Sequence, residues 1–168
     1  MAERLILITG GVRSGKSRKA LALAAPYPEK LFIATAEARD GEMQERIARH
    51  RLERGDDWQT LEEPLDLAGA MDVRPDAVAV VDCMTLWLSN AMHAEIAIDP
   101  ALDAFIAAAQ RRSAPVIVVT NEVGWGIVPV SESGRRFRDL AGTTNQRLAH
   151  AADTVWLMVS GLELRLKG

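Results

Sequence analysis

Short apolar runs alternate with longer segments of mixed polarity along almost the whole chain. The apolar runs are rich in Val, Ile and Leu, which is typical of strands buried on both faces of a parallel sheet. The segments between them have helical compositions. This alternation predicts an α/β fold with a mostly parallel central sheet flanked by helices. The expected strands are Leu5–Ile8, Leu31–Thr35, Trp58–Leu61, Ala77–Val81 and Pro115–Thr120.

The same pattern predicts the helices and the end of the chain. Residues 154–160 and 162–166 are expected to form a terminal hairpin near Gly161, and both segments are expected to extend the parallel sheet at one edge. Ligands bind at the carboxyl ends of the strands in such sheets, so functional residues are expected directly after strands. The expected helices are Arg18–Ala25, Gly41–Arg54, a helix beginning at Pro64, Met84–Met92, Pro100–Arg111 and Ser133–Ala152.

A glycine-rich motif follows the first expected strand and precedes the first expected helix. Its spacing, G-x-x-x-x-G-K-[ST], is that of a phosphate-binding P-loop, in which backbone N–H groups and the helix N-terminus surround an anion. Lys16 is expected to reach the β- and γ-phosphates of a nucleotide, and Ser17 to offer its hydroxyl to Mg²⁺. The predicted nucleotide-binding residues are Gly10, Gly11, Val12, Arg13, Ser14, Gly15, Lys16 and Ser17.

An aspartate ends the third of the long apolar runs. Asp82 has the form of a Walker-B carboxylate, which holds the P-loop magnesium directly or through water. The alternative is that Asp82 caps the helix that follows. The first interpretation predicts a metal site made by Ser17 and Asp82.

A second carboxylate and an aromatic residue follow the expected strand at 115–120. Glu122 has the position to orient a nucleophile or a metal-bound water, or to anchor the loop behind it. Trp125 stands between two glycines and is suited to covering an organic ligand, although single exposed aromatic residues are common. The sequence leaves both alternatives open.

Arginines surround one histidine in the expected helix 41–54. Arg46, His50 and Arg54 are spaced four residues apart and therefore share one helix face. Nearby positive charge disfavours the imidazolium, so His50 is expected to be neutral and nucleophilic, while the arginines bind phosphates. The alternative is a solvated helix of alternating charge. His93 and His150 have no such surroundings and are expected to be structural or surface residues.

Composition limits the class of protein. The chain has 168 residues, enough for one domain, expected over residues 1–168. Its net charge of −3 gives no electrostatic basis for binding nucleic acid. The single cysteine, Cys83, fits a reducing cytoplasm, and we expect neither a secretory leader nor a membrane span.

Taken together, these motifs resemble the bifunctional adenosylcobinamide kinase/adenosylcobinamide-phosphate guanylyltransferase family of the cobalamin pathway. The resemblance covers essentially the whole chain, with matching blocks in the family's order. The matching blocks are Ile8–Arg18, Ile33–Ala36, Met43–Arg51, Val81–Asn90, Val119–Pro129, Phe137–Ala149 and Val155–Gly161.

The resemblance implies two reactions and a P-loop α/β core. ATP or GTP would phosphorylate the aminopropanol hydroxyl of adenosylcobinamide, and GMP from GTP would then be transferred to the new phosphate with release of pyrophosphate. It implies that His50 carries GMP covalently, that Lys16 is catalytic, that Mg²⁺ is required and that the protein is a homo-oligomer, a trimer in particular. The further nucleotide-binding positions it implies are Thr35, Ala36, Glu37, Arg51, Leu52, Glu53, Arg54, Glu62 and Asp82.

Two other functions remain alternatives at this point. A P-loop kinase of small molecules would use the same motif and leave His50 idle. A GTP-binding switch would bind nucleotide without acting on a metabolite, but Thr120-Asn121-Glu122-Val123 does not match the Asn-Lys-x-Asp motif that reads the base.

Some family members carry Glu at the position of Asp82. The shorter side chain of Asp82 is expected to keep the role of holding Mg²⁺.

Overall fold

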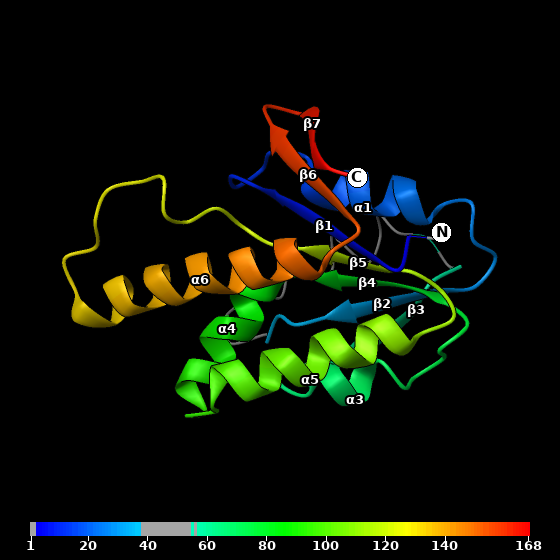
Figure 1. The fold of residues 1–168 in the computed structure, drawn as a ribbon, viewed down its shortest axis with the longest axis horizontal. Helices are drawn as coiled ribbons and strands as arrows, with labels where there is room; N and C mark the ends of the chain where they lie inside the picture. Colours follow the sequence, from blue (N-terminus) through cyan, green and yellow to red (C-terminus); the bar gives the residue numbers. More distant parts are fainter. Residues whose placement is uncertain (1–2, 38–54, 56) are drawn as a thin grey trace.

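A computed structural model describes residues 3–37, 55 and 57–168 of the protein (Figure 1). Its centre is one seven-stranded sheet with the order β3-β2-β4-β5-β1-β6-β7. All neighbouring strands run parallel except β6 and β7, which form an antiparallel hairpin at one edge. The strands are β1 (Leu5–Gly10), β2 (Lys30–Ala34), β3 (Gln59–Glu62), β4 (Val78–Asp82), β5 (Val116–Val119), β6 (Thr154–Val159) and β7 (Leu162–Lys167).

Helices cover both faces of this sheet. In Figure 1, α1 lies on one face, and α3, α4, α5 and α6 lie on the other. The longest described helix, α6, has 20 residues, and no helix in the described ranges is long and apolar enough to cross a membrane. The described helices are α1 (Lys16–Ala24), α3 (Leu67–Ala70), α4 (Met84–His93), α5 (Ile98–Arg111) and α6 (Glu132–Ala151).

The apolar strands are buried because each supplies side chains to two cores. Leu5 and Leu7 of β1 pack with the helices α3–α6, whereas Ile6 and Ile8 pack against α1. Successive side chains of a strand point to opposite faces, so a strand covered on both sides must be apolar at every position. This explains the uninterrupted apolar runs of the sequence and confirms the predicted α/β architecture.

The structure corrects one of the predicted elements and confirms another. The helix expected from Pro64 begins at Leu67, because the carboxylate of Asp66 accepts a hydrogen bond from the N–H of Gly69 at 2.9 Å and caps the helix there. The predicted terminal hairpin is confirmed, since β6 and β7 extend the sheet beyond β1, with β6 parallel to β1 and β7 antiparallel to β6. The expected helix 41–54 lies outside the described residues.

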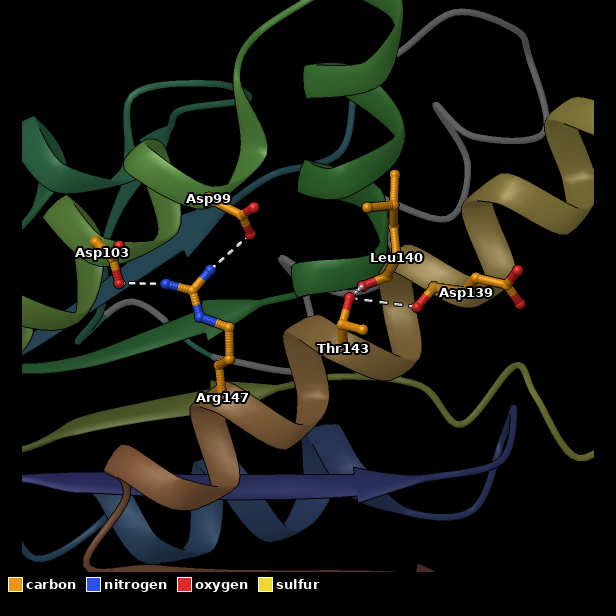
Figure 2. Close-up of polar contacts among 6 residues, drawn as sticks. All are labelled: Asp99, Asp103, Asp139, Leu140, Thr143 and Arg147. Atoms are coloured by element: carbon orange, nitrogen blue, oxygen red, sulfur yellow. Dashed lines mark hydrogen bonds and ion pairs between the residues drawn. The ribbon is translucent and has the colours of Figure 1, made fainter.

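Ion pairs join the two longest described helices. Arg147 on α6 lies between Asp99 and Asp103 of α5 and bonds to both, at 2.7 Å in the case of Asp99 (Figure 2). One turn earlier, the hydroxyl of Thr143 donates to the backbone carbonyls of Asp139 and Leu140, within α6 itself. The aspartates are largely exposed, so the ion pairs set the helix alignment and contribute at most about 1 kcal/mol to stability.

Candidate nucleotide-binding site

The P-loop connects β1 to α1 and depends on its first and sixth residues being glycine. Gly10 has φ +148°, and a Cβ there would lie 2.3 Å from the backbone oxygen of Met158 in β6. Gly15 has φ +100°, a conformation that L-residues with side chains rarely adopt. The two positions therefore let the loop turn tightly while β6 passes directly beside it.

The side chains of Ser14 and Lys16 are buried in the loop. Lys16 is 7% exposed, and its Nζ donates to the backbone carbonyl of Gly11. The hydroxyl of Ser14 is buried without a hydrogen-bond partner among the described residues. Because an unpaired buried hydroxyl is unfavourable, a ligand that accepts its proton would be stabilised here. The N–H of Gly161, in the β6–β7 turn, donates to the carbonyl of Ser14 at 3.0 Å and fixes the loop from behind.

Asp82 and Ser17 meet at the carboxyl end of the sheet. The hydroxyl of Ser17 donates to Oδ2 of Asp82 at 2.7 Å. The helix-cap alternative for Asp82 is wrong, since α4 begins after Cys83 at its N-cap and receives no side-chain cap. No cluster of three or more metal-ligating side chains occurs among the described residues. One carboxylate and one hydroxyl nevertheless fit Mg²⁺, which takes its remaining oxygens from phosphates and water.

Glu122 follows β5, the strand between β1 and β4. Its Oε1 accepts hydrogen bonds from the hydroxyl of Thr9 at 2.5 Å and from the amide of Asn145 at 3.3 Å. Its N–H donates to the carbonyl of Gly10 at 3.1 Å, where the P-loop begins. The carboxylate is thus fixed relative to the P-loop by the backbone, by β1 and by α6.

Beside it, Asn121 joins β5 to the start of α4. Its amide donates to the hydroxyl of Thr85 at 2.7 Å, and Thr85 in turn contacts Cys83 Sγ at 3.0 Å. Burial raises the pKa of the Cys83 thiol, and the nearby charge of Asp82 raises it further. Cys83 is therefore held as an inert thiol rather than a nucleophile.

These groups line one pocket with a volume of about 630 Å³. The pocket lies over the P-loop, at the carboxyl ends of β4 and β5, where ligands of open α/β sheets bind. Its lining residues are Val12, Arg13, Ser14, Gly15, Lys16, Ser17, Arg18, Asp82, Cys83, Thr85, Leu86, Val119, Asn121, Glu122 and Val123.

Several of the predicted nucleotide-binding residues lie elsewhere. Thr35 is fully buried, and its hydroxyl both accepts from the N–H of Cys83 and donates to its carbonyl, each at 2.8 Å. Glu62 ends β3 at the far edge of the sheet, and neither Ala36 nor Glu37 lines the pocket. His50 and Arg51–Arg54 lie outside the described residues. The roles of all these residues stay predictions.

Three polar side chains of the site were not predicted from the sequence. Thr9 and Asn145 hold Glu122, and Thr85 lines the pocket. Thr85 had a detectable signal, since it follows Asp82 by three residues in the first turn of a helix. Asn145 had none, because it lies 23 residues from Glu122 on a long helix.

The loop after Glu122 is exposed and apolar. Trp125 is 69% exposed, and Ile127 and Val130 are almost fully exposed. Figure 1 shows this loop projecting between β5 and α6, away from the sheet. That Trp125 covers a ligand stays a prediction.

Comparison with known sequences gives one consistent family. Residues 6–166 match the family described as cobinamide kinase / cobinamide phosphate guanyltransferase. The bifunctional adenosylcobalamin biosynthesis protein CobU of Salmonella typhimurium is 44% identical over 97% of this chain and 99% of its own length. The CobP protein of Pseudomonas aeruginosa, also called a bifunctional adenosylcobalamin biosynthesis protein, is 43% identical over 96% of both chains.

Solved structures with little sequence similarity share the fold. A Pyrococcus horikoshii protein superimposes with a TM-score of 0.57 at 6% identity, over 98% of this chain and 86% of that chain. An ATPase of a bacterial type III secretion system gives a TM-score of 0.52 at 11% identity, over 92% of this chain and 50% of that chain. At such identities the likeness concerns the fold alone, which is that of P-loop NTPases.

Proposed function

Since this chain belongs to the cobinamide kinase / cobinamide phosphate guanyltransferase family, we propose that it catalyses both steps on adenosylcobinamide. The first step transfers the γ-phosphoryl group of ATP or GTP to the aminopropanol hydroxyl. The second transfers GMP from GTP to that phosphate, giving adenosylcobinamide-GDP and pyrophosphate. The observation that carries the proposal is the pocket in which Lys16, Ser17 and Asp82 come together over the P-loop.

In the kinase step the described residues act on the phosphates. The backbone N–H groups of residues 11–16 and the N-terminus of α1 surround the phosphate chain, and Lys16 offsets charge on the β- and γ-phosphates. Ser17 and Asp82 would hold Mg²⁺, which neutralises charge on the transferred group when it is bound. Ser14 can donate its unpaired hydroxyl to a phosphate oxygen.

In the guanylyl step we assign the nucleophile to His50. Its neutral imidazole attacks the α-phosphorus of GTP, an N–P bond forms, and the P–O bond to pyrophosphate breaks. The substrate phosphate then attacks the same phosphorus and releases the imidazole. Arg46, Arg51 and Arg54 would offset the developing charge. The support for this step is the sequence pattern around His50 and the family resemblance.

Labelled GTP tests the second step and separates it from a simple kinase. The protein is incubated with α-labelled GTP and Mg²⁺ and then denatured. We expect acid-labile, base-stable label on the wild type, none on His50→Ala, and full label on His150→Ala, a matched exposed histidine on α6. Unlabelled wild type with kinase activity would leave only the small-molecule kinase, and label retained by His50→Ala would refute the histidine assignment.

The hairpin at the sheet edge supports a homo-oligomer, which the family resemblance implies to be a trimer. Leu162, Leu164 and Leu166 of β7 are more than half exposed, whereas Glu163 between them pairs with Lys19 of the same chain. A strand that turns leucines outward and charges inward is typical of an interface. We expect Leu164→Glu to lower the molar mass measured by light scattering. We also propose that the protein is located in the cytoplasm.

A further inference from the structure

We propose that Glu122 is the general base of the kinase step, which removes the proton from the acceptor hydroxyl. The inference rests on the proposed kinase activity and adds a residue that the P-loop motif does not include. β5 lies between β1, which carries the P-loop, and β4, which ends in Asp82. Glu122 comes three residues after the end of β5 and lines the same pocket as the P-loop and Asp82, at the carboxyl end of the sheet.

Only two of the described residues that line the pocket carry carboxylates. One of them, Asp82, accepts a hydrogen bond from the hydroxyl of Ser17 at 2.7 Å and belongs to the expected magnesium site. A carboxylate on a metal ion is a weak proton acceptor, because the cation stabilises its charged form. Among the described lining residues, this leaves Glu122 to accept the proton.

The surroundings of Glu122 hold one carboxylate oxygen and leave the other available. Thr9 and Asn145 both donate to Oε1, at 2.5 and 3.3 Å. Asn145 is fixed in turn. Its Oδ1 accepts a hydrogen bond from the hydroxyl of Thr120 at 2.8 Å, and its amide donates to the carbonyl of Asn121 at 3.2 Å. No hydrogen bond to Oε2 is found among the described residues. A carboxylate oriented through one oxygen, beside a phosphate site, is the arrangement that a kinase base requires.

The chemistry balances without a further reactant. The acceptor oxygen forms a bond to the γ-phosphorus as the bond from that phosphorus to the bridging β–γ oxygen breaks, and the nucleoside diphosphate leaves with the bond electrons. The hydroxyl proton passes to Oε2 of Glu122 and later to solvent. Base catalysis of this kind typically accelerates a reaction by about 10²- to 10⁴-fold.

A purely structural role for Glu122 would hold the loop that contains Trp125. Glu122→Gln separates the two roles, because the amide oxygen still accepts from Thr9 and Asn145 while the amide nitrogen cannot accept a proton. We expect kcat of phosphoryl transfer to fall by about 100-fold or more, with the KM for the nucleotide unchanged. Binding of a fluorescent GTP analogue and pyrophosphate release from GTP alone should stay at the wild-type level.

Glu29→Gln is the matched control, since Glu29 pairs with Arg74 on the surface, outside the pocket lining. It should leave both activities unchanged. Phosphoryl transfer that stays within a few-fold of wild type in Glu122→Gln would overturn the proposal. So would a parallel loss of nucleotide binding and both activities, which would identify Glu122 as an anchor. A wild-type protein without phosphoryl transfer would refute the kinase activity itself.

Discussion

The two ends of the sheet use charged side chains in opposite ways. At the carboxyl end, Asp82 and Glu122 bond to hydroxyl and amide side chains and line a pocket. At the amino end, Arg112 and Asp153 bond to backbone groups of their neighbours. The backbone bonds of Arg112 and Asp153 hold neighbouring segments together, whereas the side-chain partners of Asp82 and Glu122 can be exchanged for a ligand. Substitutions at the carboxyl end should therefore change activity, and those at the amino end should change stability.

The largest expected effect is at the carboxyl end, in Lys16→Ala. Removal of the cation over the phosphates should lower phosphoryl transfer by about 10³-fold, equivalent to roughly 4 kcal/mol of transition-state stabilisation. Steady-state kinetics measure the loss, and urea unfolding should show a stability close to wild type. Lys30→Ala, which removes an ion pair with Asp57 at the start of β2, is the control and should keep full activity. If Lys16→Ala kept its activity, the expectation that substitutions at the carboxyl end of the sheet change activity would be wrong.

Arg112→Met should give the largest loss of stability. Arg112 is 4% exposed, and burial lowers the pKa of its guanidinium, which stays charged and bridges carbonyls that precede β4. Its substitution removes a hydrogen-bond donor from each of these carbonyls, two of them in buried bonds, which should cost about 3 kcal/mol in urea unfolding. The bridged carbonyls belong to Met71, Val73, Arg74 and Ala77.

The neighbouring Arg111→Met is the control for that measurement, because Arg111 is exposed and should change stability by less than about 0.5 kcal/mol. At the temperature of the assay, folded Arg112→Met should retain wild-type kcat. A large drop in kcat with unchanged stability would reverse the assignment of Arg112 to the structural end.

Asp82→Asn should lower activity by about 100-fold and leave stability within about 0.5 kcal/mol. The asparagine oxygen still accepts from Ser17, so the local fold is kept, but the charge that favours Mg²⁺ is lost. Kinetics over a range of Mg²⁺ concentrations should show that excess Mg²⁺ partly restores the rate. If the loss of activity in Asp82→Asn did not depend on the Mg²⁺ concentration, Asp82 would not belong to the metal site.

The smallest effect is expected from Asp153→Asn, and it depends on pH. Hydrogen bonds from the N–H groups of Leu5 and Arg4 lower the pKa of Asp153. A lowered pKa in the folded state contributes stability above about pH 4, the ordinary Asp value, and this is lost as the pH falls through the lowered value.

Because Asp153 is exposed, the contribution should be at most about 1 kcal/mol. Urea unfolding between pH 3 and 7 should therefore show a shallower acid-side loss for Asp153→Asn than for wild type. An identical acid-side loss in the two proteins would show that the contacts with β1 do not depend on the charge.

The sequence predicted the parts of the molecule that depend on local pattern. The apolar runs became strands, and the P-loop and Asp82 came out at the expected ends of β1 and β4. The order of the strands across the sheet could not be predicted, because an apolar run carries no information that places β5 between β1 and β4. The antiparallel hairpin of β6 and β7 was predictable, because a two-residue turn at Gly161 imposes an antiparallel return.

The site was predictable only where a motif spans it. Ser17 and Asp82 carry motif signals, whereas Thr9 and Asn145 are ordinary polar residues within a strand and a helix. Their contact with Glu122 exists because α6 packs beside β1 and β5, which is a tertiary event. The roles assigned to His50 and Arg51–Arg54 stay predictions.

The close passage of β6 beside Gly10 has a consequence for how the protein is made. The P-loop leaves the ribosome before its walls, β6 and the Gly161 turn, because these segments lie more C-terminal in the chain. Until β6 and the Gly161 turn are made, a nascent chain therefore carries the complete phosphate motif without the backbone that holds it in shape. We therefore expect the protein to bind nucleotide only once β6 and β7 have docked, because contacts between distant parts of a chain form slowly.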